Sequence, residues 1–163
     1  IYEGTNGIQA MDLVLRKLAM RMGGVVTDHM DRIRATVAEL AEAGAEFDSM
    51  RAELSASVET LAEVTNWIMT NGLADPVEAL AGATPYLRIF GIVTGGWLLA
   101  RQALAAQAEL NAGSEDKGYL SAKITTARYY AEQHLPQAAG LVPMVQAGSK
   151  VLYDVDAETL ASV

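Results

Sequence analysis

The sequence contains no cysteine among its 163 residues. Disulfide bonds, thiolate metal ligands and a cysteine nucleophile are therefore excluded, although this absence says little about the redox compartment. Histidine is nearly as scarce: only His29 and His134 occur, and neither follows a glutamate by three residues, as histidines do in di-iron bundles. We therefore expect no metal site, and we expect both histidines to be surface or helix-capping residues.

Positively charged residues are also fewer than negatively charged ones. The chain has 12 Lys and Arg against 20 Asp and Glu, which gives a formal net charge of −8. Binding to nucleic acid requires a clustered basic face that neutralises phosphates, and docking on an anionic membrane has a similar requirement. We expect neither kind of partner. The sequence also shows no alternating strand pattern, no phosphate-binding glycine loop and no nucleophile-elbow serine.

A hydrophobic run long enough to cross a membrane is not expected either. The uncharged stretch from Ile89 to Ala100 is bracketed by Arg88 and Arg101, and it is far shorter than the roughly 20 apolar residues that a membrane span needs. We predict a buried helix there. Gly91 and Gly95, with Gly96 following, leave one side of this helix nearly bare, so we expect another helix to pack closely against it.

Apolar residues recur at three- and four-residue intervals through most of the chain, which is the spacing of one helix face. The clearest case is the third expected helix, whose stripe is Met50, Leu54, Val58, Leu61, Val64 and Ile68. Caps, prolines and glycines indicate where helices begin and end. The expected helices cover approximately 7–23, 28–44, 49–71, 76–82, 85–110, 116–134 and, interrupted by Gly140 and Pro143, 135–147. The sequence thus predicts an all-α fold, a bundle of about four long helices with short additional helices.

Apolar residues also mark the two ends of the chain. The face of the first expected helix comprises Ile8, Met11, Leu15, Leu18 and Met22. Asp12, Arg16 and Lys17 lie mostly off that face, and we expect them to be solvated or paired at the surface. At the other end, residues 151–153 are apolar enough to pack back on the bundle, and we expect fraying beyond Asp154.

The first nine residues are the one stretch whose order suggests a catalytic or binding role. Glu3 precedes the flexible Gly4, and Thr5 and Asn6 then offer N-cap side chains for a helix beginning near Gly7. A helix N-terminus favours phosphate or other anions, so a base beside such a site suits a cofactor enzyme. The alternative is that Glu3 is an ordinary acid that stabilises the helix start by about 0.3–1 kcal/mol.

The run Tyr2-Glu3-Gly4-Thr5, followed by a helix carrying Ile8-Gln9, resembles the catalytic-base segment of the acyl-CoA dehydrogenase family. Segments within 83–100 (ATPYLR and GIVTGGWLLA) and 122–132 (AKI and TARYYAE) resemble the extra C-terminal helical domain of the longer, 3-methylmercaptopropionyl-CoA dehydrogenase-like members. These matching segments are scattered over most of the chain.

The resemblance implies an FAD enzyme that oxidises an acyl-CoA thioester to a trans-2-enoyl-CoA. It implies that Glu3 is the catalytic base that removes the α-proton while a hydride leaves the β-carbon for the flavin. Gly4 would lie against the substrate, and Thr5, Asn6 and Gly7 would meet the adenosine diphosphate portion of FAD. The implied partners are acyl-CoA, an electron-transfer flavoprotein as acceptor, and further copies of the chain in a homo-oligomer.

The same resemblance divides the chain into the catalytic-base motif with the last helix of the dehydrogenase body (1–24), a C-terminal helical-bundle domain (25–150) and a tail (151–163). We expect a C-terminal fragment of a cytoplasmic enzyme, inactive by itself. The first helix would pack against the upstream body, which would leave its apolar face partly uncovered in this chain. The alternative is a non-catalytic helical module for interaction or oligomerisation, whose resemblance to an enzyme reflects ancestry only.

Overall fold

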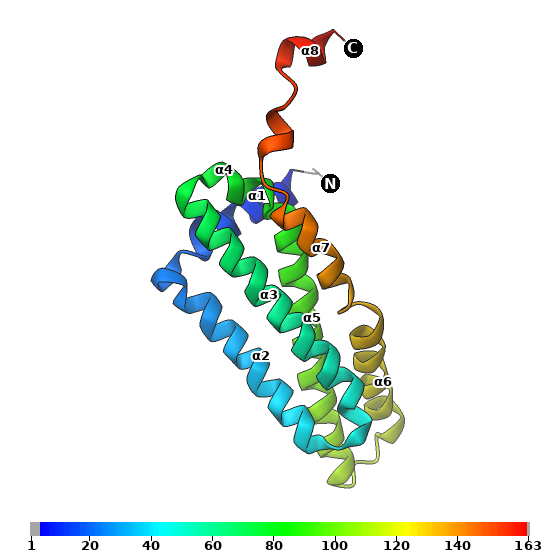
Figure 1. Ribbon diagram of the computed structural model, residues 1–163. Coiled ribbons are helices and arrows are strands. Elements are labelled where there is room, and N and C mark those ends of the chain that lie inside the picture. Colours follow the sequence, from blue (N-terminus) through cyan, green and yellow to red (C-terminus); the bar gives the residue numbers. More distant parts are fainter. Residues whose placement is uncertain (1–3, 163) are drawn as a thin grey trace.

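The computed structural model describes residues 4–162, and every regular element in that range is helical (Figure 1), which confirms the all-α prediction. The α-helices are α1 (Thr5–Asp12), α2 (Gly24–Ala43), α3 (Asp48–Ala74), α4 (Pro76–Ala81), α5 (Ala83–Asn111), α6 (Lys117–Gln133), α7 (Gln137–Gln146) and α8 (Ala157–Ala161). A π-helical turn, η1 (Leu13–Lys17), and three 3₁₀ segments, η2 (Met20–Gly23), η3 (Ala45–Phe47) and η4 (Lys150–Tyr153), connect or extend them. The long helices α2, α3, α5 and α6 correspond to the expected helices 28–44, 49–71, 85–110 and 116–134.

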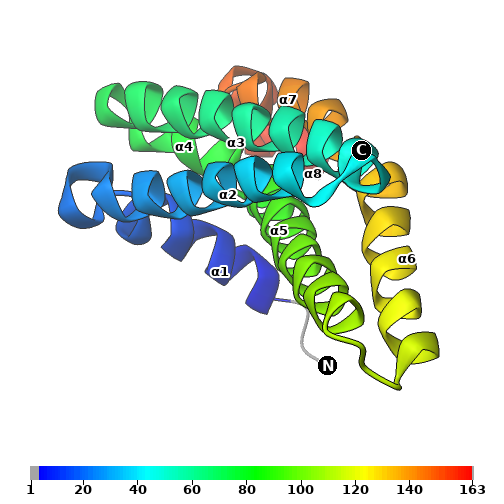
Figure 2. The same cartoon turned by 90° about the horizontal axis from the view of Figure 1, so that it is seen from below.

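Helix α5 is the centre of the molecule. It packs against α1, α2, α3, α6 and α7, with its most extensive contacts to α6. In the view from below, α2 and α3 lie side by side, and α5 passes between α1 and α6 (Figure 2). The N-terminal helix and the C-terminal helices are therefore joined mainly through α5.

The core follows the predicted helix faces closely. All six stripe residues of α3 have at most 1% of their surface exposed, and Met30, Ile33 and Leu40 of α2 are buried as well. Fully burying a side chain of this size contributes about 1.5–3 kcal/mol relative to leaving it exposed. Periodic burial over several helices therefore supplies most of the driving force for this fold.

Three hydroxyl groups lie among these apolar side chains, and each has a partner. Thr65 Oγ1 contacts the hydroxyl of Tyr86 at 2.8 Å, Trp97 Nε1 donates to Thr36 Oγ1 at 2.9 Å, and Ser57 Oγ donates to the carbonyl of Leu135 at 3.3 Å. Buried polar groups are tolerated when they are hydrogen-bonded in this way. The bonds link α3 to α5 and to the turn after α6, and they link α2 to α5. They therefore help to set the relative positions of these helices.

The N-terminal region differs from the single helix predicted over 7–23. Helix α1 begins at Thr5, passes into the π-turn η1, and the chain then reverses where Arg21 and Met22 adopt left-handed conformations, with φ of 52° and 55°. Helix α2 begins at Gly24, four residues before the helix predicted over 28–44. Thr27 lies within α2, and its hydroxyl donates to the carbonyl of Gly23.

The glycines of α5 give close packing at two of the three predicted positions. A Cβ on Gly95 would lie 2.8 Å from the hydroxyl oxygen of Tyr130, which donates to the carbonyl of Ile92, and a Cβ on Gly96 would lie 2.5 Å from Leu135. Gly91 faces open space, so the prediction was wrong for this residue. The close neighbours are side chains from α6 and from the turn after it.

Helix α5 is also long and apolar enough to cross a membrane when length and composition alone are considered. Helices at the centre of a packed bundle share this length and composition. In this structure the surrounding helices α2, α3, α6 and α7 cover the buried positions of α5, including Tyr86, Ile89 and Val93. One face of α5 is therefore part of the core.

The C-terminal end departs from the bundle (Figure 1). Residues 150–161, named the C-terminal arm, contain the exposed side chains of Val151, Leu152 and Tyr153. The prediction that residues 151–153 pack back on the bundle was therefore wrong. Just before the arm, Ser149 is fixed to Glu78 of α4 through its backbone N–H and its hydroxyl, and Gly148 turns the chain with a φ of 71°. The arm is therefore anchored at its base only.

Candidate functional site

The segment that the sequence singles out opens helix α1. Glu3, the predicted catalytic base, lies outside the described residues. Gly4 is the N-cap of α1, and Thr5, Asn6 and Gly7 form the first turn. The prediction that Thr5 and Asn6 cap a helix beginning near Gly7 was wrong in register, because the helix starts two residues earlier and its cap makes no side-chain hydrogen bond.

This first turn is accessible. Gly4, Thr5 and Gly7 are all exposed, and a Cβ at either glycine would meet no other atom within 4 Å. The backbone N–H groups of a first helical turn have no partner within the helix and carry the positive end of its dipole. The turn therefore fits an anionic group such as a diphosphate, and the bulk of any such site must be supplied from outside the described residues.

The charged groups at the end of α1 and in η1 are already paired with one another. Arg16 makes a two-pronged contact with Asp12, through Nε at 2.6 Å and Nη2 at 2.9 Å, and Lys17 Nζ lies 3.1 Å from the same carboxylate. These contacts lower the pKa of Asp12 to about 2. The three residues are thus paired at the surface, as predicted.

The two histidines have different environments. His29 is half-buried, stacks on Phe90 with ring centroids 5.1 Å apart, and contacts Thr94 Oγ1 through Nε2 at 3.0 Å. Burial, followed by the charge of Arg32, lowers the pKa of His29. The prediction of a surface or capping role was therefore wrong for His29, while His134 does stand at the C-cap of α6. Among the described residues no group of three His, Asp or Glu side chains could hold a metal ion.

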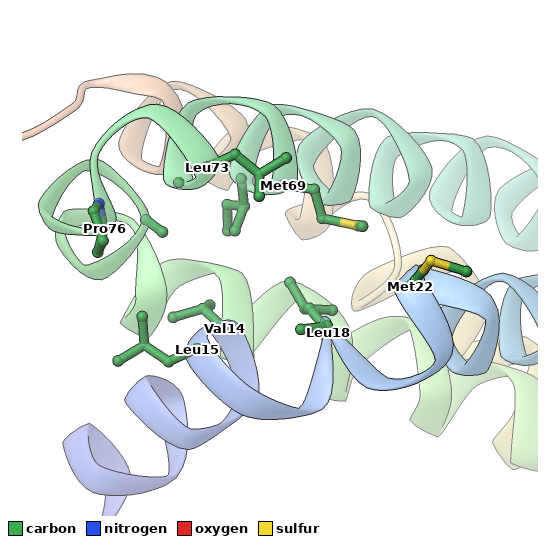
Figure 3. A pocket seen from close by; sticks show the side chains of 11 residues that line it. Val14, Leu15, Leu18, Met22, Met69, Leu73 and Pro76 are labelled. Carbon is green, nitrogen blue, oxygen red and sulfur yellow. The ribbon is translucent and has the colours of Figure 1, made fainter.

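A concave surface lies at the same end of the molecule as α1. It is a pocket of about 510 Å³, named the apolar groove, between η1 and η2 on one side and α3 and α4 on the other (Figure 3). Its principal side chains are Val14, Leu15, Leu18, Met22, Met69 and Leu73. No lining residue carries a charge, so the groove suits an apolar occupant.

Sequence reasoning did not find this groove, although α3 contained a signal for it. The buried stripe of α3 ends at Ile68, and its spacing passes over Met69 and Leu73, which lie on a different face. An apolar residue off the core face of an otherwise periodic helix indicates a second contact surface. The reversal at Arg21 and Met22, which forms the opposite wall, had no comparable signal.

The described residues thus define an all-α helical domain whose first helix opens at the N-cap Gly4. Residues 29–156 match the family model described as "Acetyl-CoA dehydrogenase C-terminal like". The chain belongs to this family.

Comparison with curated proteins gives relatives of the same kind. The chain is 37% identical over 139 residues to 3-methylmercaptopropionyl-CoA dehydrogenase of Ruegeria pomeroyi, a match that covers 85% of this chain and 24% of that protein. It is 29% identical over 147 residues to a broad-specificity linear acyl-CoA dehydrogenase of Mycobacterium tuberculosis and 30% identical over 164 residues to butyryl-CoA dehydrogenase of Syntrophomonas wolfei. These matches cover 83% and 97% of this chain, and 23% and 26% of the relatives. The chain thus spans about a quarter of the length of the relatives it matches.

Proposed function

We propose that this chain is the C-terminal part of an FAD-dependent acyl-CoA dehydrogenase, in which residues 1–24 complete the catalytic body, 25–150 form an added helical domain and 151–163 form a tail. The observation that carries the proposal is the family match over residues 29–156, combined with the Tyr-Glu-Gly-Thr run that leads into α1. The names of the three relatives, all acyl-CoA dehydrogenases, support the same reaction class.

In this proposal Glu3 is the base that takes the α-proton of an acyl-CoA thioester. A carboxylate does this efficiently only when water is excluded around it, because burial raises its pKa toward the working pH. The backbone N–H of Glu3 would donate to the thioester carbonyl and stabilise the charge that develops there. FAD, when bound, supplies the acceptor for the hydride that leaves the β-carbon, so the products are the trans-2-enoyl-CoA and reduced flavin.

The first turn of α1 takes a binding role in the same proposal. Gly4 leaves room for the substrate, since nothing lies within 4 Å of its Cβ position. The N–H groups of Thr5, Asn6 and Gly7 would meet the diphosphate of FAD, as an exposed helix start allows. Since most of both pockets would come from the preceding polypeptide, we propose that the chain alone is inactive, and that electron-transfer flavoprotein reoxidises the complete enzyme.

The test is a Glu3→Gln substitution in the complete enzyme, with flavin absorbance followed anaerobically after acyl-CoA is added. We expect flavin reduction to slow by about 10²–10⁴-fold, which is the usual contribution of a general base. Glu39→Gln on the exposed face of α2 is the matched control and should reduce at the wild-type rate.

A second candidate function is a non-catalytic interaction module, which the exposed apolar groove favours. It predicts a complete protein that is colourless and cannot be reconstituted with FAD. If the protein does bind FAD but Glu3→Gln leaves its reduction by acyl-CoA unchanged, Glu3 is an acid at a helix start and another base must be sought.

A further inference from the structure

A second pocket, named the basic pocket, lies where η1, η2 and the start of α2 meet α5. Its volume is about 440 Å³, which is within the usual range for small-molecule sites. Two of its lining residues, Arg16 and Lys17, carry positive charge, and no Asp or Glu is among the described residues that line it. The basic pocket shares no lining residue with the apolar groove, so the two are distinct features.

The rest of the basic pocket is apolar apart from one imidazole ring. Met20, Val25, Val26 and Phe90 form this wall, and Met20 and Val25 are partly exposed. The imidazole of His29, stacked on Phe90, completes the lining. Burial lowers the pKa of His29, so the ring is neutral at pH 7 and adds no positive charge. The pocket therefore combines a hydrocarbon wall with positive charge on its η1 side only.

The two cations on η1 retain hydrogen-bonding capacity although both contact Asp12. That carboxylate takes two of the five N–H donors of Arg16 and one of the three donors of Lys17. Asp12 itself does not line the pocket. Its single negative charge against two positive charges leaves the group with a net charge of +1. One further monoanion at the pocket would neutralise the group and use the donors that remain.

We propose that the basic pocket binds an aliphatic monocarboxylate of medium chain length, with its carboxylate at Arg16 and Lys17 and its hydrocarbon chain on the apolar wall. The planar guanidinium fork matches the geometry of a carboxylate. A phosphate monoester, with a charge of about −1.5 to −2 at pH 7, would exceed the net positive charge of the group. This inference goes beyond the proposed function and does not rest on it, because none of the lining residues belongs to the segment around Glu3.

The first test follows lysine acetylation in the complete protein, with octanoate as the probe. Lys17 reports on the basic pocket, and Lys117 is the matched control, because both are exposed and Lys117 opens α6 at the opposite end of the bundle (Figure 1). The protein is treated with an acetylating reagent at increasing octanoate concentration. The acetylated peptides are then quantified by mass spectrometry.

We expect octanoate to slow acetylation of Lys17 by about fivefold or more at saturation, because a ligand site encloses most of its ligand and excludes the reagent. The half-maximal effect should fall near about 1 mM, as expected for a ligand with so few heavy atoms. Lys117 should react at a constant rate. Octanol and octylamine keep the hydrocarbon chain but lack the negative charge, so neither should protect Lys17 at the same concentration.

The second test changes the pocket wall. Val25→Glu introduces a carboxylate at the second residue of α2, where an acid suits a helix start, so the variant should fold. We expect the octanoate concentration needed to protect Lys17 to rise by about tenfold or more, because like charges repel. Val25→Gln has the same length without the charge and should stay within about threefold of the wild type. Protection of Lys17 reports on this pocket even if octanoate also binds elsewhere.

Three results would overturn the proposal. The first is a Lys17 acetylation rate that octanoate leaves unchanged or that octylamine lowers equally. The second is a Lys17 that is unreactive before octanoate is added, since the pocket would then be filled by other parts of the complete protein. The third is an equal loss of protection in both Val25 variants, which would show that charge is not recognised. None of these readings uses flavin absorbance or Glu3, so a protein that binds no FAD would refute the proposed function and leave this inference standing.

Discussion

Tyr86 is the largest side chain that the core encloses completely. Thr65 Oγ1 donates its proton to the carbonyl of Leu61 at 2.7 Å, so the 2.8 Å contact between the two hydroxyls is a bond that Tyr86 donates. Burial raises the pKa of Tyr86 well above its usual value, which keeps this donor protonated. The two hydroxyls therefore form a short chain of hydrogen bonds, which runs from Tyr86 on α5 through Thr65 to the carbonyl of Leu61 on α3.

Thr65→Val tests this direction. Valine matches the shape of threonine but leaves the buried Tyr86 hydroxyl without its acceptor, and we expect the free energy of unfolding to fall by about 1–3 kcal/mol. Tyr86→Phe removes the donor itself and should cost less, about 0.5–1.5 kcal/mol. Urea unfolding of both variants and of the double variant is the measurement. Additive losses would show that the two hydroxyls are not coupled.

At the level of elements, α5 requires glycine at only some of its positions, and one of these faces the turn that follows α6. Gly96 is buried, and a Cβ on it would lie against three atoms of the Leu135 side chain, which is itself almost completely buried. Gly91, five residues earlier on the same helix, faces open space. The two residues therefore allow the effects of helix propensity and of packing to be separated.

We expect Gly91→Ala to raise the free energy of unfolding by about 0.5–1 kcal/mol, because alanine is the better helix former. Gly96→Ala gains the same propensity but inserts a methyl group into occupied space, so we expect a net loss of about 1–3 kcal/mol. Thermal and urea unfolding measure both. A stabilising Gly96→Ala would mean that Leu135 can be displaced at little cost.

The sequence predicts an element well where the local spacing of apolar residues determines which face is buried, and poorly where distant contacts do. The stripe of α3 from Met50 to Ile68 is predicted residue by residue, since local periodicity and burial agree there. The same periodicity fails in the N-terminal region, where Ile8 and Met11 keep helical spacing but Ala10 and Leu13 are buried. Packing against α5 selects that face, and this long-range contact has no local signature.

The candidate site is predictable to a similar extent. The order of residues around Glu3 predicts a catalytic-base segment by resemblance, and this stays a prediction because Glu3 lies outside the described residues. The groove, in contrast, is assembled from η1 and η2 together with α3 and α4, two pairs of elements that are distant in sequence. Its formation depends on the reversal at Arg21 and Met22, two residue types with no preference for left-handed backbone. Backbone geometry that tertiary contacts impose is not encoded in composition or spacing.

For the whole molecule, the bundle and the C-terminal arm are nearly independent. The arm begins after Ser149, whose hydroxyl lies 2.5 Å from Glu78 Oε1, and the side chains beyond it are exposed. Residues without buried contacts contribute little to the stability of a fold.

Deletion of residues 151–163 should therefore leave the free energy of unfolding within about 0.5 kcal/mol of the full chain. Ser149→Ala is the informative comparison, since it breaks the hydroxyl bond to Glu78 at the base of the arm and should cost about 1 kcal/mol. Urea unfolding of the purified chain compares them. A large loss from the deletion alone would show that the arm does pack on the bundle in solution.

The central position of α5 has a consequence for synthesis on the ribosome. Helices α2 and α3 emerge first and can pair, but several of their buried residues, including Thr36 and Thr65, meet partners on α5 that are translated later. Until α5 leaves the exit tunnel, the nascent chain presents an incomplete hydrophobic face, which is the kind of surface that chaperones bind and that aggregates form from. The period of greatest risk thus lies between the emergence of α3 and that of α5.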